Sequence, residues 1–205
     1  MSDFRRRLMR KKIESELPSG YTKLKCLIND ADNYMSLGES FADNFGYEFD
    51  AECFENNLYV SPCGCNFNSI ALFNGQIVYQ NNKYGTKGKH SYYHRRKGTT
   101  REIGNEEWSV SFTNPVPSSF KFLIFGLGYS NNDVPHQDTG LTASQACQMK
   151  GKIYSLKIYN NYDMTNIIHD LVPCLDNNNE PCMYDKITKN TYYNLRSGGQ
   201  FLYEI

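Results

Sequence analysis

Three carboxylates alternate along the stretch YEFDAE and form the sharpest chemical signal in the sequence. Glu48, Asp50 and Glu52 stand two residues apart, so in a β-strand all three side chains would share one face. Two carboxyl groups that flank a glycosidic bond can hydrolyse it, one as the acid and the other as the nucleophile or base. We keep glycoside hydrolysis as a remote alternative, because the polar face of a half-exposed strand has the same pattern.

Two short groups of thiols and imidazoles could supply ligands for a metal ion. The sequence CGC contains Cys63 and Cys65, and the sequence HSYYH contains His90 and His94. These four side chains could complete a tetrahedral zinc site, but Cys-x-Cys is less typical of zinc than Cys-x-x-Cys. Buried thiols and a surface loop explain the same residues, so we expect no metal ion and no other cofactor. Calcium would need clustered oxygen atoms, and the aspartates that could supply them have no special spacing: Asp30, Asp32, Asp133 and Asp138.

The segment KYGTKGKHSYYHRRKGTTR is the most basic part of the chain, and tyrosines are interleaved with its cations. Aromatic rings beside fixed cations could hold acidic glycans or single-stranded nucleic acid. A solvated hairpin tip has the same composition, although exposed loops on a rigid sandwich often carry recognition. The candidate glycan-binding residues in this predicted loop are Tyr92, Tyr93, Arg95 and Arg96.

A second predicted loop, GYSNNDVPHQDTG, is rich in planar polar side chains. Such side chains can make paired hydrogen bonds to sugar hydroxyls, and the face of a tyrosine suits the apolar side of a sugar ring. Ordinary turns use the same residue types. The candidate glycan-binding residues here are Tyr129, Asn131, Asp133, His136 and Asp138.

These side chains need a scaffold, and the chain from residue 17 onward has the rhythm of an all-β protein. Short stretches rich in Tyr, Phe, Val and Ile alternate with Asn, Gly, Asp and Pro, which is typical of a β-sandwich. Asn74-Gly75 is the strongest hairpin signal. Trp108 shares a strand face with Val110 and Phe112, which predicts a core position, and one short helical turn could form at 141–149. The predicted strands are 24–28, 34–37, 47–54, 69–73, 76–79, 107–113, 120–129, 152–159, 167–172 and 200–205.

The stretch GKIYSLKIYNNYDMTNIIHDLVPC predicts a β-hairpin near the end of the chain. Residues 160–163 form an Asn-rich turn between its two strands, and Pro173 should end the second strand. The first strand should place apolar side chains on one face and polar side chains on the other: Tyr154, Leu156 and Ile158 against Ser155 and Lys157. The pair would therefore belong to a sheet with one wet face.

The bulk composition narrows the classes of protein. Lys plus Arg and Asp plus Glu are both 22 in 205 residues, so the global charge gives no argument for nucleic acid or an acidic membrane. No apolar run is long enough for a membrane span, and the basic start lacks the apolar stretch of a secretory signal. The seven cysteines are an odd number in a chain that can form its own core, so we expect mainly reduced thiols. Cys174 and Cys182 could pair only if a hairpin brought them opposite each other.

The first 16 residues differ in character from the rest and could form a short amphipathic basic helix. A frayed, solvated tail is the other interpretation. We predict two units, a docking arm at 1–16 and one domain at 17–205. The residues of the arm that would contact a partner are Phe4, Arg5, Arg6, Arg7, Leu8, Arg10 and Lys11.

Both ends of the domain resemble a family of laminin-G-like, concanavalin A-like jelly-roll domains. The opening LPSGYTKLKCLINDADNYMSLG resembles the entry strands of the family. The closing segments GKIYSLKIYNN, HDLVPC, MYDKITKNTYYN and SGGQFLYEI resemble, in order, its penultimate hairpin, Val-Pro corner, Tyr-Asp turn and approach to the last strand. The chain departs from the family at Cys182 and Met183, where members often have a glycine. The middle of the chain matches the family only in the spacing of its predicted strands.

The resemblance implies a two-sheet antiparallel jelly roll whose first and last strands lie side by side. Such domains are common in virion proteins of tailed bacteriophages and prophages of gut bacteria, but the fold carries lectins, glycanases and inert modules alike. We therefore expect a non-enzymatic virion structural or decoration protein of a head, tail or fibre, assembled in the host cytoplasm. Its partners would be other virion proteins, in many copies or a homo-oligomer. The alternative is an adhesin for host surface polysaccharide, and we expect neither membrane nor nucleic acid as a partner.

Overall fold

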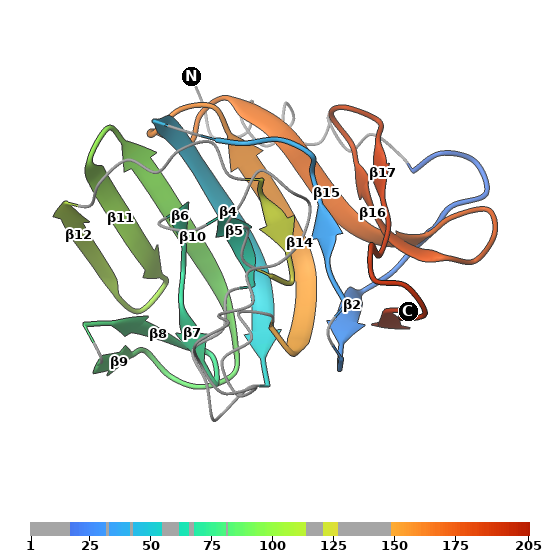
Figure 1. Ribbon diagram of the computed structural model, residues 1–205, viewed down its shortest axis with the longest axis horizontal. Helices are drawn as coiled ribbons and strands as arrows, with labels where there is room; N and C mark the ends of the chain where they lie inside the picture. The colour runs from blue at the N-terminus through green and yellow to red at the C-terminus, as the bar shows by residue number, and fades with distance from the viewer. Residues whose placement is uncertain are drawn as a thin grey trace, which may run out of the picture.

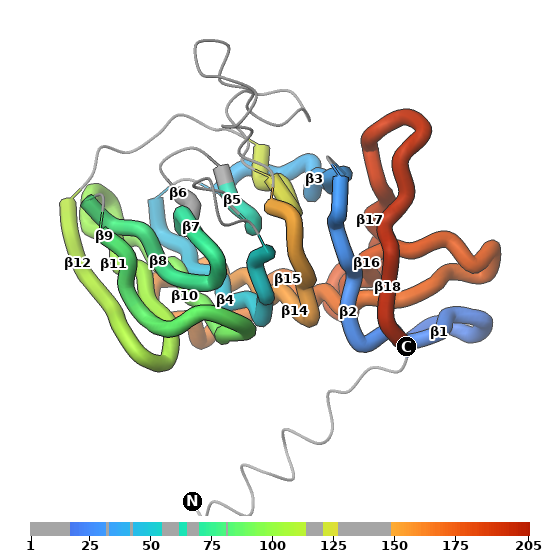
Figure 2. The backbone as a smooth tube through the Cα atoms, turned by 90° about the horizontal axis from the view of Figure 1, so that it is seen from below, coloured from blue at the N-terminus to red at the C-terminus, as the bar shows by residue number. Residues whose placement is uncertain are grey.

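The computed structural model describes residues 17–31, 33–41, 43–54, 62–65, 68–80, 82–113, 121–126 and 149–205. Every regular element in these ranges is a β-strand, and every strand pairing is antiparallel. Figure 1 shows the strands face-on, and Figure 2 shows them stacked in two layers. The predicted all-β sandwich is therefore confirmed, while its jelly-roll connectivity stays a prediction. The helical turn predicted at 141–149 lies outside the described residues except for Met149.

One layer is an 11-stranded sheet, which we call the large sheet. Its main path runs β12 (Ser109–Thr113), β11 (Thr100–Asn105), β10 (Lys89–Lys97), β4 (Asn44–Cys53), β14 (Gly151–Tyr159), β15 (Ile167–Leu175), β16 (Pro181–Asp185) and β17 (Thr191–Tyr192). Off this path, β1 (Thr22–Lys23) pairs with β15, while β2 (Cys26–Asn29) pairs with β14 and with β18 (Leu202–Glu204). The last strand thus lies beside an early one, as the resemblance implied.

The second layer consists of two smaller sheets that cover the inner face of the large sheet (Figure 2). One has the order β3 (Met35–Ser36), β13 (Leu123–Ile124), β5 (Cys63–Cys65) and β6 (Asn68–Ser69). The other has the order β7 (Leu72–Phe73), β8 (Gln76–Tyr79) and β9 (Asn82–Tyr84). Asn74 and Gly75 join β7 to β8 with φ of 48° and 83°, the two positive values that a type I′ hairpin turn requires. The hairpin predicted there is confirmed.

The core lies between the layers and is anchored by an aromatic row on β4. Phe45, Tyr47 and Phe49 are buried, whereas Glu48 between them is half-buried on the opposite face. Tyr47 stacks on His94 across the β4–β10 pair, with ring centroids 5.0 Å apart. Each cross-strand aromatic pair of this kind adds about 0.5–1.5 kcal/mol beyond the area that it buries. The predicted placement of the three carboxylates on one strand face is confirmed.

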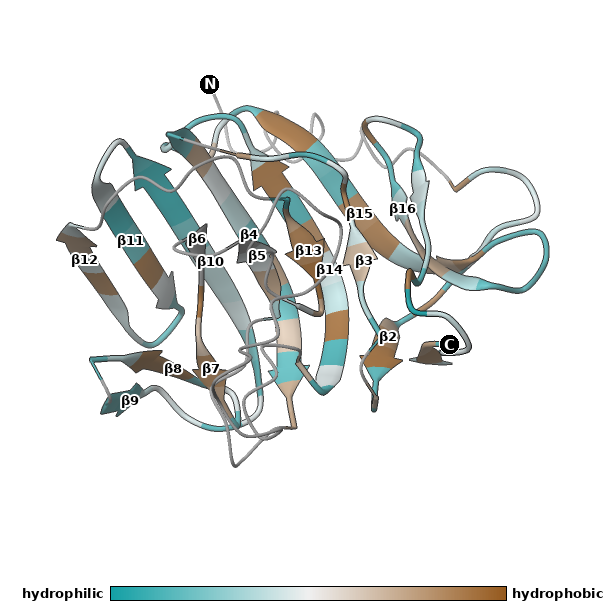
Figure 3. Ribbon diagram, in the orientation of Figure 1, coloured by the Kyte–Doolittle hydropathy of each residue, from teal (hydrophilic) through white to brown (hydrophobic). Residues whose placement is uncertain are grey.

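The β10–β11 hairpin was not predicted, because the sequence indicated an exposed basic loop there. Figure 3 shows how hydrophilic both strands are. The inner face of β10 consists of His90, Tyr92, His94 and Arg96, all buried. None of these four residues is aliphatic, so the hydropathy of the sequence does not indicate the alternation of inward and outward side chains along β10.

Two local predictions for the late hairpin are wrong in detail. Tyr154 does not share a face with Leu156, because the register of β14 against β4 shifts between Ile153 and Ser155. The extra residue of this β-bulge turns Tyr154 to the outward side. Pro173 does not end β15, since its carbonyl accepts a hydrogen bond from Leu24 N at 3.0 Å and the strand continues to Leu175. The hairpin itself and its Asn-rich turn are confirmed, and Asn161 Oδ1 accepts backbone N–H groups within that turn.

The β15–β16 hairpin brings two buried cysteines together. Cys174 and Cys182 lie directly opposite in register, with their sulfur atoms 3.4 Å apart and not bonded. The sequence allowed these two cysteines to pair only if a hairpin brought them opposite each other. The β15–β16 hairpin does bring them opposite each other. Cys26, Cys174 and Cys182 form no disulfide bond.

Candidate functional site

Three adjacent strands of the large sheet, β10, β4 and β14, share a hollow on the outward face, the face away from the second layer. Its volume is about 200 Å³. Asp50 is central, because it lies opposite Ser91 of β10 on one side and Ser155 of β14 on the other. The hollow is lined by Glu48, Phe49, Asp50, Ser91, Tyr92, Tyr93, Ser155 and Lys157.

Both oxygen atoms of Asp50 accept hydrogen bonds from serine hydroxyls. Ser91 Oγ donates to Oδ1 at 2.6 Å, and Ser155 Oγ donates to Oδ2 at 3.1 Å. Within the described part of the chain, no lysine or arginine forms a salt bridge with Asp50. The floor of the hollow is therefore a carboxylate held between two hydroxyls, without a cation of its own.

Glu48 bounds one side of the hollow and is already paired. Lys157 Nζ donates to Glu48 Oε1 at 2.8 Å, and Tyr159 OH donates to the same oxygen at 2.9 Å. Burial by itself lowers the pKa of Lys157, but the hydrogen bond and charge of Glu48, aided by Asp170 and Asp50, raise it on balance. Lys157 therefore stays charged and held by Glu48.

The carboxylate of Glu102 on β11 is the centre of a second polar cluster, which holds two tyrosines at one edge of the site. Tyr93 OH donates to Glu102 Oε1 at 2.8 Å, Arg95 Nη2 donates to Oε2 at 2.7 Å, and Tyr162 OH donates to Oε2 at 3.2 Å. The Arg95 guanidinium also lies 4.7 Å from the centroid of the Tyr162 ring. Burial alone raises the pKa of Glu102, yet the bonds from Arg95 and Tyr93 lower it overall. The two tyrosines are thus held in place beside the hollow.

On the opposite side of Asp50, Tyr154 supplies a third aromatic ring. Its hydroxyl donates to Glu52 Oε2 at 3.3 Å, and Lys89 Nζ lies 3.8 Å from the centroid of its ring. Lys152 Nζ lies 3.9 Å from the same Glu52 oxygen. The outward face therefore alternates aromatic rings with polar groups, a surface suited to the apolar faces and hydroxyls of sugars.

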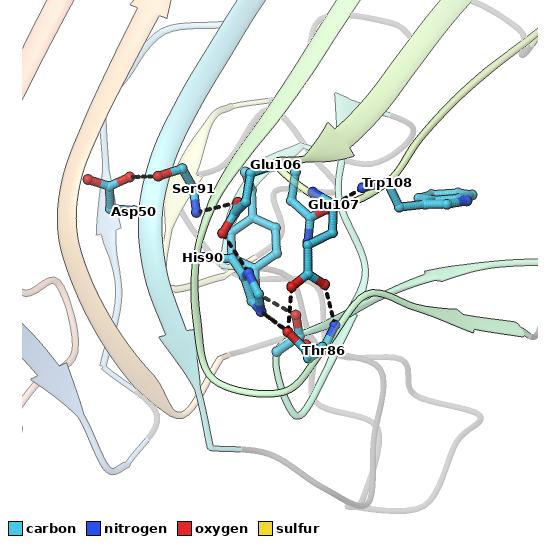
Figure 4. Close-up of polar contacts among 10 residues, drawn as sticks. Asp50, Thr86, His90, Ser91, Glu106, Glu107 and Trp108 are labelled. Atoms are coloured by element: carbon cyan, nitrogen blue, oxygen red, sulfur yellow. Dashed lines mark hydrogen bonds and ion pairs between the residues drawn. The ribbon is translucent and has the colours of Figure 1, made fainter.

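A chain of polar contacts runs from the hollow to the loop before β10 (Figure 4). Ser91 N donates to Glu106 Oε2 at 3.2 Å, and Glu106 Oε1 lies 2.7 Å from His90 Nδ1. The hydroxyl and the backbone N–H of Thr86 both bond to Glu107 and hold the pKa of that carboxyl below its usual range. These contacts tie the loop to the turn between β11 and β12 and steady the strand that carries Ser91.

Thr86, His90 and Glu106 resemble a nucleophile–base–acid triad in distance but not in hydrogen-bond direction. Thr86 Oγ1 lies 3.3 Å from His90 Nε2, slightly beyond the separation of about 2.6–3.2 Å between an activated nucleophile and its base. Moreover, Thr86 Oγ1 donates its only proton to Glu107 Oε1 at 2.7 Å. His90 Nε2 also lies 3.0 Å from the Thr86 carbonyl oxygen, which can only accept. The hydroxyl proton of Thr86 is therefore directed to Glu107 and not to His90, unlike the proton of an activated nucleophile.

Of the four glycan-binding residues predicted in the first loop, two face the site and two face the protein interior. Tyr93 and Arg95 face outward at the site, but from a strand rather than from a loop. Tyr92 and Arg96 face the interior and are 1% and 0% exposed, because strand alternation turns every second residue of β10 inward. Tyr92 OH instead donates to the Gly75 carbonyl at 2.5 Å and joins the two layers. The expectation that these two residues lie on an exposed loop is wrong.

The metal-ligand candidates are dispersed among the described residues. His94 is fully buried, and Arg101 Nε donates to its Nε2 at 3.1 Å. Burial, and then the charges of Arg101 and Arg96, hold the pKa of His94 well below its usual range. Cys63 is buried, and Asp30 is exposed. In the ranges that the structure describes, no three His, Cys, Asp or Glu side chains are grouped closely enough to hold a metal ion.

The second predicted loop and the docking arm lie outside the described residues, and those predictions stay open: Tyr129, Asn131, Asp133, His136, Asp138, Phe4, Arg5, Arg6, Arg7, Leu8, Arg10 and Lys11. Asp32 also lies outside them. Trp108 is half-buried, packs against the core and stacks on Tyr84 with ring centroids 4.0 Å apart, as a core position predicts. Among the described residues, no helix has the length and apolar character that crossing a membrane requires.

Sequence reasoning missed much of the site. The missed residues are Ser91, Glu102, Tyr154, Ser155, Lys157, Tyr159 and Tyr162. The polar face of the strand at 152–159 was a usable signal, since Ser155 and Lys157 were predicted to be wet. Nothing in the sequence showed that this face meets the carboxylates of β4.

Comparisons with known proteins add little to this geometry. No protein-family model matches the chain, and no curated protein matches it. A structural search finds a candidate carbohydrate-binding protein of Bacteroides ovatus, solved at 1.50 Å, with a TM-score of 0.49 and 11% sequence identity. The similarity covers 89% of this chain but only 60% of that one. At this level of similarity, no function is transferred from that protein to this chain.

Proposed function

We propose that this protein binds a carbohydrate in the hollow between β10, β4 and β14. The observation that carries the proposal is Asp50, held between Ser91 and Ser155 at the floor of an outward-facing hollow. A carboxylate and hydroxyls can accept hydrogen bonds from sugar hydroxyls, while Tyr93 and Tyr154 flank the floor with rings that suit the apolar face of a sugar. Sugar-binding sites commonly combine a few such fixed polar groups with aromatic surface.

The proposed function is binding without catalysis. Hydrolysis would need one carboxyl group to donate a proton to the glycosidic oxygen and a second to attack or activate water. Glu48 Oε1 already accepts from Lys157 and Tyr159, and both oxygens of Asp50 accept from serines. In these contacts each carboxyl group only accepts hydrogen bonds and neither is placed as the proton donor that hydrolysis needs, which favours a binding role for the carboxylates.

Tyr93→Ala should weaken attachment to polysaccharide-coated bacteria about tenfold, or about 1.4 kcal/mol, because it removes a ring beside the hollow. The measurement presents the full-length protein on beads in many copies, so that weak single contacts add up, and counts bound cells with and without their surface polysaccharide. Tyr203→Ala is the matched control, since Tyr203 is 41% exposed on β18. Equal attachment by the two variants would rule out Tyr93 as a ligand contact.

The setting that we propose for this module is the surface of a phage particle. The support is the sequence resemblance to laminin-G-like, concanavalin A-like domains of virion proteins, together with the basic segment at 1–16. Many copies on one particle would convert a weak lectin into a firm attachment, because the second and later contacts are effectively intramolecular.

Deletion of residues 1–16 should abolish incorporation into particles while the domain at 17–205 stays folded. The reason is that the arm carries the clustered cations and apolar residues that would contact another virion protein. Incorporation is measured by mass spectrometry of purified particles, and folding is measured by the melting temperature of the purified protein. Particles that still contain the truncated protein would exclude the arm as the docking element.

A further inference from the structure

The hollow has an excess of negative charge at its floor. Its lining contains two carboxylates, Glu48 and Asp50, and one ammonium, that of Lys157. Lys157 is committed to Glu48 at 2.8 Å. Asp50 is left with hydroxyl partners only, so its charge is not neutralised by a salt bridge in the described part of the chain.

The polar groups of the floor offer acceptors rather than donors. Ser91 and Ser155 each have one hydroxyl proton, and both protons are directed to Asp50. What these hydroxyls can still offer a ligand is lone pairs, and the carboxylate has only lone pairs to offer. A ligand that reaches Asp50 and its two serines must therefore bring the hydrogen-bond donors for these three groups itself.

The nearby cations do not reverse this preference. Arg95 is bound to Glu102 at 2.7 Å, and Arg96 faces the interior. Lys89 lies over the ring of Tyr154 rather than over Asp50. The basic segment that suggested acidic glycans in the sequence thus provides no unpaired cation at the floor among these residues.

We propose that the hollow selects a sugar that carries a protonated amine, such as an unacetylated hexosamine, over neutral sugars, and that it disfavours acidic sugars. An ammonium group brings both the hydrogen-bond donors that the floor requires and the positive charge that would neutralise the Asp50 carboxylate. A uronate brings a second carboxylate beside Asp50 and is repelled. This inference rests on the proposed carbohydrate-binding function and specifies the class of ligand for the same site.

The test measures the affinity of the full-length protein for four tetrasaccharides at about pH 6 by isothermal titration calorimetry. The probes are a glucosamine tetramer, an N-acetylglucosamine tetramer, cellotetraose and tetragalacturonate. A single charge pair at a partly exposed site contributes on the order of a tenfold change in affinity. We expect the glucosamine tetramer to bind about tenfold more tightly than the two neutral probes, and tetragalacturonate to bind most weakly. The preference should shrink as salt is raised, because the charges become screened.

Asp50→Asn keeps the size of the side chain but removes its charge, so the glucosamine tetramer should then bind within about twofold of cellotetraose. Asp30→Asn is the matched control for net charge, since Asp30 is exposed and not part of the hollow lining, and it should retain the full preference. Tighter binding of tetragalacturonate, or an amine preference that survives in Asp50→Asn, would overturn the inference. Failure of all four probes to bind would also overturn it. Tyr93-dependent attachment to polysaccharide-coated cells then decides separately whether the proposed carbohydrate-binding function stands.

Discussion

Asp185→Asn should lower the free energy of unfolding by about 3–5 kcal/mol, the usual cost of breaking a buried charged pair. The Asp185 side chain is fully buried, and both of its oxygen atoms accept hydrogen bonds. Oδ2 accepts from His169 Nδ1 and Thr188 Oγ1, each at 2.7 Å, and Oδ1 accepts from the backbone N–H groups of Asp170 and Ile187. An asparagine amide would point its own donors at some of these donors.

This loss is measured by chemical denaturation, and in a chain of this size it corresponds to a drop of roughly 10 °C in Tm. Asp163→Asn provides the control, because Asp163 is exposed in the turn of the neighbouring hairpin, and it should change stability by less than about 0.5 kcal/mol. Similar stabilities for the two variants would mean that the buried network does not hold β15 and β16 together.

The pH dependence of the same pair has a definite sign. Burial alone raises the pKa of Asp185, but its hydrogen bonds, first that from His169, lower it well below the usual range. Burial alone lowers the pKa of His169, but Asp185 and Glu39 raise it on balance. Stability from Asp185 is therefore present above its unfolded pKa of about 3.9 and is lost as the pH falls. Stability from His169 is present below its unfolded pKa of about 6.5 and is lost as the pH rises. The difference between wild type and Asp185→Asn should be largest between roughly pH 4 and 6.5.

Arg96→Ala should destabilise the domain by about 2–5 kcal/mol, as other large-to-small substitutions in a core do, because the side chain is fully buried. Arg96 lies opposite Phe45 on β4, and its Nε donates to the Gly98 carbonyl at 2.8 Å. Truncation would remove packed methylene groups as well as this hydrogen bond. From the sequence alone, the same substitution would have been expected to act on glycan binding.

Its neighbour in sequence is the matched control. Arg95 faces outward and is paired with Glu102, so Arg95→Ala should cost at most about 1 kcal/mol of stability. Because Arg95 helps to fix Tyr93 and Tyr162 through Glu102, this variant should instead reduce attachment to cells. Denaturation curves and the bead assay on both variants check the pair. Equal stability losses would contradict the assignment of the two residues to opposite faces of β10.

Local patterns are enough to predict the class of fold and several of its elements, because their signals lie within a few residues of one another in the chain. Alternation along β4 placed Glu48, Asp50 and Glu52 on one face, and Asn74-Gly75 specified a tight turn. The Asn-rich turn after β14 was equally local, since Asn161 satisfies backbone groups only a few residues away. Short-range patterns of this kind are fixed by strand period and turn chemistry.

The choice of neighbouring strands and their register depend on long-range contacts, which no local pattern specifies. Ser91 and Ser155 lie far from Asp50 in the sequence, and a register shift of one residue would turn either serine to the other face. The bulge that exposes Tyr154 arises from the pairing of β14 with β4, and Arg96 is fully buried on the inward face of β10 although its sequence neighbours are hydrophilic. The hollow exists because three strands align their outward side chains, and such an alignment depends on contacts between residues far apart in the chain.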